Sequence, residues 1–287
     1  MTDSSLWRFR DLVLDVRDTA QPGFGGEVLL PWLERHPEVV AELRDVGRPE
    51  SHARVVGRDE CLLEGLYAVS RLVDILVAPH QPVNGDPAVL SWLSPGHPWW
   101  VGPLPSVAAW SSFCGAIGAI AIAEDSFHPF FHEIVAVTPA EDPAQPPTLI
   151  DQLWPGALIG GLVLARAGVT VRAGADHLDP DVAARSCLYW AWWRRNRVAR
   201  DLSHGWGHNS QWRTDFRRDY LVGDALHYNV DCAVPTLPNP ADEDTDLTPQ
   251  DRRDLVRYRH SVTIDLGDDR WPYYDSLVEP RARPTVI

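Results

Sequence analysis

Apolar and polar residues alternate on both sides of Gly223, and this alternation constrains the fold more than any other feature of the sequence. Side chains on a β-strand point alternately to its two faces, so the pattern predicts two strands that each bury one face. A three-residue loop that begins at Gly223 keeps the apolar faces of both strands on one side. The sequence therefore predicts an antiparallel hairpin over residues 211–230, with Tyr220 opposite Tyr228 and Val222 opposite Leu226.

Helical periodicity dominates the N-terminal region. Residues 36–47 carry a proline at the first helical position and a glycine at the end, and residues 58–78 place an apolar residue every three or four positions. The apolar runs at 111–125 and 150–167 are interpreted as two further, buried helices. Frequent Val, Ile and Phe over residues 127–139 favour a strand.

The C-terminal region mixes helix starts with strands. Asp179 before Pro180, and Thr248 before another proline, are typical of helix N-caps. Seven consecutive apolar residues, CLYWAWW, must be surrounded by protein wherever they lie. Residues 258–266 are expected to pair with residues 270–277 in a last hairpin.

These patterns together predict a single domain of the α+β class over residues 1–287. Residues 1–125 form a mainly helical half, which packs against a mainly antiparallel sheet from the C-terminal half. Residues 126–287 mix helices with antiparallel hairpins.

All 26 basic residues are arginine, because the sequence contains no lysine. Pyridoxal phosphate enzymes and P-loop proteins need a lysine amine, so both classes are excluded. The formal net charge of −14 disfavours nucleic acid as a partner, because such binding depends on a basic surface.

The arginines are unevenly placed, since eight of them fall between Arg185 and Arg218, where only two acidic residues occur. An acidic chain thus contains one cationic segment. Such a segment can hold an anionic ligand, pair with the protein's own carboxylates, or meet an acidic partner. The hairpin register sets Asp219 beside Asn229 and Arg217 beside Asp231, as internal pairing requires.

The sequence also bears on the compartment. The first 18 residues contain four Asp and no long apolar run, which fits neither a secretory signal nor a transit peptide. No apolar stretch reaches the about 20 residues that a bilayer-spanning helix needs. The four cysteines are far apart and form no CxxC pair, which argues against a zinc knuckle and a disulfide scaffold. We expect a cytoplasmic protein with reduced thiols and no membrane contact.

The densest group of polar functional side chains begins at His204. Gly205 and Gly207 let the chain turn tightly, so the imidazoles of His204 and His208 can converge. Either imidazole is a candidate for acid-base catalysis. The pair is also a candidate for holding a divalent metal if a further ligand completes the site, for which the sequence offers Asp215, His227 and Asp231.

The strand that follows carries the candidate substrate-binding residues. Arg213 and Arg217 share one strand face, and each guanidinium can bind a carboxylate or phosphate through two hydrogen bonds. Asn209 and Gln211 are candidates for positioning the same ligand. The alternative is an Arg and Asp ladder that neutralises itself.

Residues 127–133, FHPFFHE, contain two histidines four positions apart. Pro129 and the β-branched residues after it argue for a strand, where His128 and His132 would lie about 13 Å apart. A zincin-like metal pair is therefore not expected. Glu133 alternates with apolar neighbours, so it is a candidate general base or a member of an internal ion pair.

Cys114 is the candidate nucleophile. It precedes Gly115 and is interpreted as lying near a helix N-terminus, where backbone N–H groups stabilise a thiolate. With His128 or His132 as base and Glu133 as the orienting group, it could form a catalytic triad. The alternative is a buried structural thiol.

Two functional hypotheses follow. The first is a cytoplasmic enzyme that acts on an anionic small molecule or peptide through a His, Arg and Gln pocket built on residues 203–219. The second is a non-catalytic interaction protein, of the immunity or adaptor kind, whose acidic and Trp-bearing surface masks a basic protein partner. No complete catalytic motif decides between them, and a divalent metal is an open possibility for the first.

Overall fold

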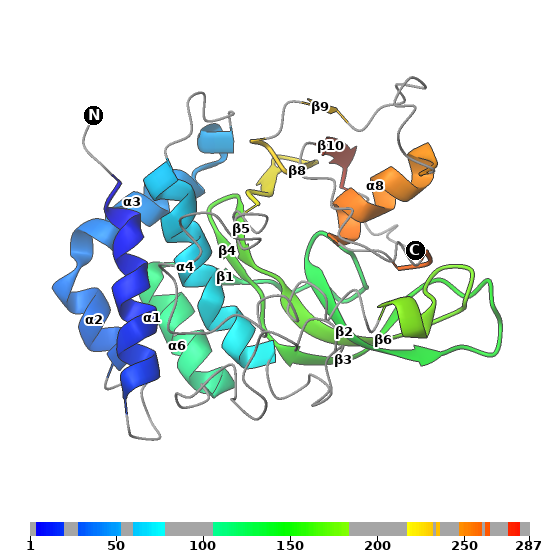
Figure 1. The fold of residues 1–287 in the computed structure, drawn as a ribbon, viewed down its shortest axis with the longest axis horizontal. Helices are drawn as coiled ribbons and strands as arrows, with labels where there is room; N and C mark the ends of the chain where they lie inside the picture. Colours follow the sequence, from blue (N-terminus) through cyan, green and yellow to red (C-terminus); the bar gives the residue numbers. More distant parts are fainter. Residues whose placement is uncertain are drawn as a thin grey trace, which may run out of the picture.

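The computed structural model describes residues 4–19, 28–52, 60–77, 106–183, 217–231, 234–235, 247–259, 262–264 and 275–281. A layer of helices from the N-terminal half lies beside two sheets that come mainly from the C-terminal half (Figure 1). The fold class is α+β, and the larger sheet is mainly antiparallel, as the sequence predicts.

The helical layer is built from amphipathic segments. The predicted bounds of the proline-initiated helix at residue 37 are confirmed, and in α4 the apolar stripe with Leu66, Val69 and Val73 is buried. The elements of this layer are η1 Ser5–Arg8, α1 Phe9–Asp18, α2 Leu30–Arg35, α3 Pro37–Gly47, η3 Pro49–His52, α4 Glu60–Val77 and α6 Val107–Ile117.

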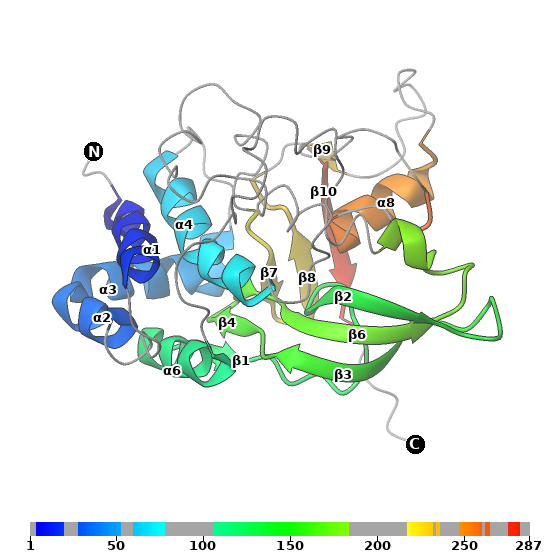
Figure 2. The same ribbon diagram turned by 60° about the horizontal axis from the view of Figure 1, so that its bottom comes forward.

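The larger sheet has the strand order β1-β4-β5-β7-β8-β10-β9, and its neighbouring strands are antiparallel except for the parallel pair β10 and β9. Its strands are β1 Ile120–Ala121, β4 Ala157–Ile159, β5 Leu162–Ala165, β7 Tyr220–Val222, β8 Ala225–Tyr228, β9 Val234–Pro235 and β10 Asp275–Pro280. Helix α8, Pro249–Tyr258, lies beside β10 (Figure 2).

The smaller sheet has three strands in the order β2-β6-β3, with β2 parallel and β3 antiparallel to β6. These strands are β2 His132–Pro139, β3 Thr148–Trp154 and β6 Ala167–Ala173. Figure 2 shows this sheet extending away from the helical layer.

Three groups of buried apolar side chains hold the layers together. The largest joins helices α1, α2, α3, α4 and α6 to strands β2, β3, β4, β5 and β7. The second lies between the larger sheet and α8, and the third lies under one face of the smaller sheet. Among the described residues, no helix has the length and apolar character needed to cross a membrane.

Two helix starts predicted from the sequence are confirmed. Thr248 accepts a hydrogen bond from the backbone N–H of Asp251, whose carboxylate accepts from the backbone N–H of Thr248, so α8 begins with a capping box. The carboxylate of Asp179 accepts from the backbone N–H groups of Asp181 and Val182 and caps a helical turn.

The predicted helix over residues 150–167 is wrong, because this segment forms most of β3 and all of β4 and β5. Gly160, with φ 57°, turns the chain between β4 and β5. Strand β5 is buried along its whole length, so it reads as a continuous apolar run. Such a run cannot be told from a buried helix by periodicity alone.

The hairpin at Gly223 exists, but its predicted register is wrong. The loop has two residues, Gly223 with φ 58° and Asp224, and Tyr220 lies opposite His227. Tyr220 packs in the core shared with the helices, whereas Leu226 packs toward α8 on the other side. The sheet is thus buried on both faces here, and matching apolar residues no longer fixes the register.

Two strand predictions near the C-terminus and at residue 127 are also corrected. Strand β10 pairs with β8 and β9, and residues 262–264 form a bend, so the described parts of the last predicted hairpin do not pair with each other.

The strand expected over 127–139 begins only at His132. A turn precedes it, in which the carbonyl of His128 accepts from the backbone N–H groups of Phe131 and His132.

Candidate functional site

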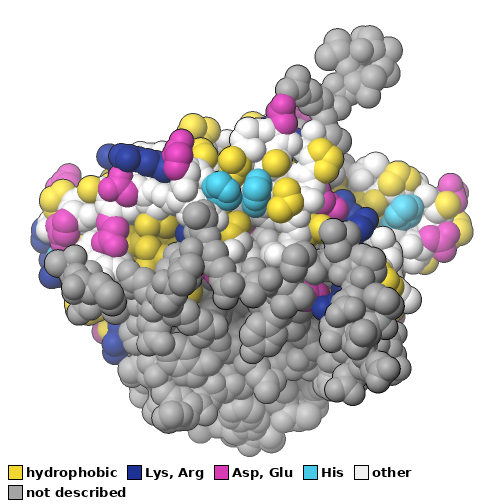
Figure 3. All heavy atoms as spheres, turned by 90° about the horizontal axis from the view of Figure 1, so that it is seen from above, with side chains coloured by type: hydrophobic (Ala, Val, Ile, Leu, Met, Phe, Trp, Pro, Cys, Tyr) yellow, Lys and Arg dark blue, Asp and Glu magenta, His cyan; other side chains and the backbone are white. Residues whose placement is uncertain are grey.

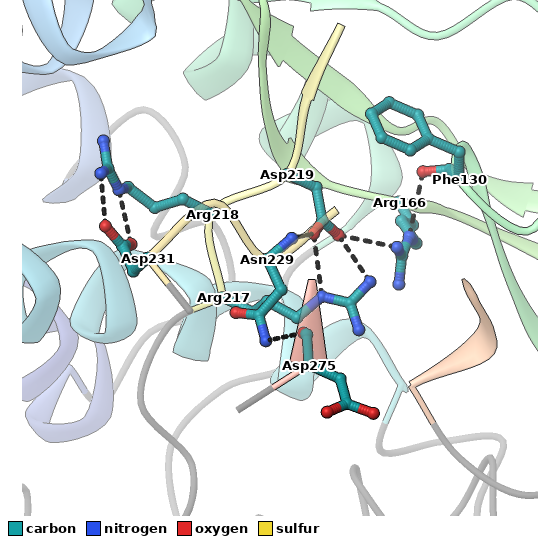
Figure 4. Close-up of polar contacts among 8 residues, drawn as sticks. All are labelled: Phe130, Arg166, Arg217, Arg218, Asp219, Asn229, Asp231 and Asp275. Atoms are coloured by element: carbon teal, nitrogen blue, oxygen red, sulfur yellow. Dashed lines mark hydrogen bonds and ion pairs between the residues drawn. The ribbon is translucent and has the colours of Figure 1, made fainter. Parts of the chain in front are cut away.

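The polar centre of the molecule is the carboxylate of Asp219, which lies directly before β7 and is 3 % exposed. It accepts hydrogen bonds from Arg217 Nε at 2.8 Å, from Arg217 Nη2 at 3.1 Å and from Arg166 Nη2 at 2.8 Å. The backbone N–H of Asn229 supplies a fourth bond at 2.8 Å. Figure 4 shows the two guanidinium groups converging on this one carboxylate. We call these residues the Asp219 cluster.

Electrostatics keep Asp219 ionised in this buried position. Burial raises the pKa of its carboxyl, but Arg217 and Arg166 outweigh burial and hold this pKa below its ordinary value. Burial also lowers the pKa of Arg166 to about 10, although Asp219 acts against this shift. Both partners are charged at neutral pH, so the cluster is a buried ion pair network.

Arg166 occupies the connection between β5 and β6. Its side chain is 2 % exposed, and its Nε donates to the carbonyl of Phe130 at 3.0 Å. The guanidinium thus ties three segments together: the turn before β2, the β5–β6 connection and the residue before β7. An arginine this deep in the fold requires such partners, because an unpaired buried charge is very costly.

Arg218 points the other way along the same chain (Figure 4). Its guanidinium forms a two-bond ion pair with Asp231 and donates to the carbonyl of Ser51 at 3.0 Å. It also donates to the hydroxyl of Tyr220, which donates in turn to the carbonyl of Val46 at 2.6 Å. This second network fixes η3 and the end of α3 to the hairpin. The predicted pairing of Arg217 with Asp231 is wrong, because Asp231 pairs with Arg218.

Asn229 links the Asp219 cluster to β10. Its φ of 55° is in the left-handed region, which asparagine tolerates better than most residues. There its Nδ2 donates to the carbonyl of Asp275, whose side chain forms a two-bond ion pair with Arg252 of α8. The predicted contact between Asp219 and Asn229 is present, through the carboxylate and a backbone N–H.

The two histidines of FHPFFHE lie close together, which corrects the predicted strand separation. The backbone N–H of His128 donates to His132 Nδ1 at 3.0 Å, and that of Phe130 donates to His128 Nδ1 at 3.1 Å. Both rings therefore carry their proton on Nε2. Burial lowers the pKa of each histidine to about 4, with Arg257 contributing for His128. His132 Nε2 is buried without a hydrogen-bond partner among the described residues.

Cys114 is in the last turn of α6, which corrects its predicted place near a helix N-terminus. Its carbonyl accepts from the backbone N–H of Ala119 beyond the helix, after Gly118 with φ 82°. Burial raises the pKa of the thiol to about 12, so the thiolate is disfavoured. The structure therefore removes the premise on which the nucleophile assignment was based.

Most of the predicted site lies outside the described residues. His204, His208, Asn209, Gln211 and Arg213 belong to this group. Arg217 is the predicted binding residue that the structure describes. Its guanidinium forms an ion pair with the carboxylate of Asp219. Glu133 is partly buried at the start of β2, one residue after His132.

The predicted site did not include Arg166 or Asp219. One signal was available: Arg166 follows an apolar run in the sequence, and a charge in such a run needs a buried partner. In the part of the chain that the structure describes, no group of three or more His, Cys, Asp or Glu residues is arranged to hold a metal ion.

Comparison with known proteins gives no relative. The chain matches no protein-family model, no curated protein and no solved structure.

Proposed function

We propose that this chain is a non-catalytic binding protein whose partner is a basic protein, and that the outer face of the smaller sheet is the binding surface. We define the outer face by six exposed residues on the side of the sheet that carries Arg172, which are Ala136, Thr138, Thr148, Ile150, Asp151 and Arg172. The opposite face of the same strands packs on buried apolar residues.

The outer face has the composition of a binding surface. Thr138, Arg172 and Thr148 lie side by side in the strand register, and Ile150 is 47 % exposed at a bulge of β3. Ala136, Thr138 and Thr148 are small side chains, so they leave room beside Arg172 on which a partner can pack. Strand β3 is an edge strand among the described residues, and exposed edges are natural places for association.

Charge indicates the kind of partner, and this is the observation that carries the proposal. Four exposed carboxylates lie on the outer face or in the loops at one end of it, where the described residues supply one exposed guanidinium, that of Arg172. Figure 3 shows acidic side chains at the end of the molecule where the β2–β3 connection lies. Surfaces of one sign steer and select partners of the opposite sign. We call the four residues the rim carboxylates: Glu141, Asp142, Asp151 and Asp176.

The cationic segment supports the same proposal. Arg217 and Arg218, its described members, are both committed to internal ion pairs. They are therefore not available to clamp an anionic substrate.

A charge-matched pair of variants tests the proposal. A rim variant, Glu141→Gln with Asp151→Asn and Asp176→Asn, and a control variant, Asp11→Asn with Asp15→Asn and Glu34→Gln, each remove three exposed carboxylates. Binding of a fluorescent decalysine peptide is followed by anisotropy. We expect the rim variant to lose several-fold more affinity than the control. Equal losses of affinity in both variants would refute the proposal, because they would show that the peptide responds to the net charge of the protein and not to the rim carboxylates.

The enzyme hypothesis is retained as a second candidate on one observation. The imidazole of His128 is neutral at pH 7 and lies within the electrostatic influence of Arg257, Arg166 and Arg281. Its Nδ1 already accepts the backbone N–H of Phe130, so the ring offers its Nε2–H as a donor, and a donor near cations suits an anionic ligand. Titration with millimolar inorganic phosphate, followed by the NMR signals of the His128 ring, tests this idea. Unchanged signals would remove it.

A further inference from the structure

Two histidines from distant parts of the chain meet on the surface above η3 and β8. The ring centres of His52 and His227 are 5.0 Å apart, with an angle of 66° between the ring planes. Both side chains are partly exposed. Figure 3 shows two histidine side chains next to each other on this face, flanked by hydrophobic groups.

Hydrogen bonds fix the backbone on which each histidine lies. His227 is the third residue of β8 and pairs with Tyr220 on one side and with Val278 on the other. His52 ends η3, and the adjacent carbonyl of Ser51 accepts from the buried guanidinium of Arg218. Arg218 belongs to the hairpin that carries His227, so one network holds both histidines in place.

The hydrogen bond of the His52 ring uses Nδ1 and leaves Nε2 available to bind a metal ion. Its Nδ1 lies 2.7 Å from the carbonyl of Pro49 and donates to it, since a carbonyl oxygen only accepts. The neutral ring then presents the lone pair of Nε2. A metal-binding histidine typically has this arrangement, in which its other ring nitrogen donates to a backbone carbonyl.

The spacing of the rings fits one shared ion. Two imidazoles that bind one zinc ion at about 2.1 Å, with a tetrahedral angle between them, have ring centres about 5 Å apart. The 5.0 Å separation of the His52 and His227 ring centres matches this value.

We propose that His52 and His227 bind one divalent transition metal ion, with Cu²⁺, Ni²⁺ and Zn²⁺ as the ions that imidazole ligands suit. Among the described residues no third His, Cys, Asp or Glu completes the site. The remaining positions are therefore open to water or to a donor from a bound partner. The site is separate from the outer face and does not depend on the proposed function.

Calorimetric titration of the full-length protein with NiCl₂ at pH 7.5 tests this site. We expect one ion to bind, and His52→Ala or His227→Ala to lower the affinity at least tenfold. The double variant should bind nickel about as weakly as either single variant, because one imidazole alone retains little of the affinity. His177→Ala, at an exposed histidine of another surface, should leave the affinity unchanged.

Two further measurements guard against misfolding and against other histidines. His227→Asn keeps a polar side chain at the position and should lose nickel as His227→Ala does, with an unchanged far-UV circular dichroism spectrum. Copper bound to the wild type should show two nitrogen ligands by electron paramagnetic resonance. Full nickel affinity in the double variant, or no binding by the wild type, would overturn the proposal.

Discussion

The Oδ2 atom of Asp219 lies 2.8 Å from Nη2 of Arg166, and this buried ion pair joins positions 53 residues apart. Both side chains are at most 3 % exposed. Water therefore cannot replace either partner, and the cluster depends on each of its charges.

Asp219→Asn should lower the free energy of unfolding by about 3–5 kcal/mol, because it leaves buried guanidinium groups uncompensated. Urea denaturation followed by tryptophan fluorescence measures this loss. The control is Asp45→Asn, which removes an exposed ion pair with Arg48 and should cost less than about 1 kcal/mol. Similar losses in both variants would contradict a buried, structural role for Asp219.

The histidine turn predicts a pH dependence of stability. Burial lowers the pKa of His128 and of His132 from 6.5 to about 4, so the unfolded chain takes up protons first as the pH falls. Their contribution to stability is complete above pH 6.5 and is lost as the pH falls from 6.5 to 4. Urea denaturation at several pH values in this window measures the slope.

His132→Asn should flatten this pH dependence, because it removes one of the two titrating groups while Oδ1 can accept the bond from His128 N. His177→Asn, at an exposed position, should leave the slope as it is. A slope that is the same in wild type and His132→Asn would show that His132 does not cause it.

Two glycines in open surroundings isolate the effect of backbone conformation, because an added methyl group would cause no steric clash at either position. A Cβ atom at Gly223 or at Gly115 would meet no heavy atom within 4 Å. Gly223 has a φ of 58°, so Gly223→Ala should cost about 1–2 kcal/mol. Gly115 lies within α6, so Gly115→Ala should stabilise by about 0.5–1 kcal/mol. Thermal unfolding distinguishes the two, and effects of equal sign would refute this reasoning.

Cys114 should resist alkylation in the folded protein, because its thiol is buried and has a pKa of about 12. Treatment with iodoacetamide at pH 8, followed by peptide mass spectrometry, should find Cys114 modified only after denaturation. Rapid labelling of the native protein at this residue would restore it as a candidate nucleophile.

Local signals in the sequence were enough to place many elements. Pro37, Thr248 and Asp179 each mark a helix start that the structure confirms, because capping and the fixed φ of proline act within one turn. The apolar stripe of α4 is equally local. These features require no knowledge of what the helix packs against.

Local signals failed where a segment is buried on more than one side. Residues 150–167 form strands and not a helix, and the hairpin at Gly223 has a register set by two cores. The sequence period reports a single buried face, so it carries no information once both faces are covered.

The candidate sites divide in the same way. Composition alone excluded lysine-dependent chemistry and established an acidic chain with one arginine-rich segment. Only the tertiary structure decided that Arg217 and Arg166 share Asp219, that His128 and His132 meet in a turn, and that His52 reaches His227. Charge and residue type are properties of the chain, whereas the partner of a buried charge is chosen by which distant segments pack together.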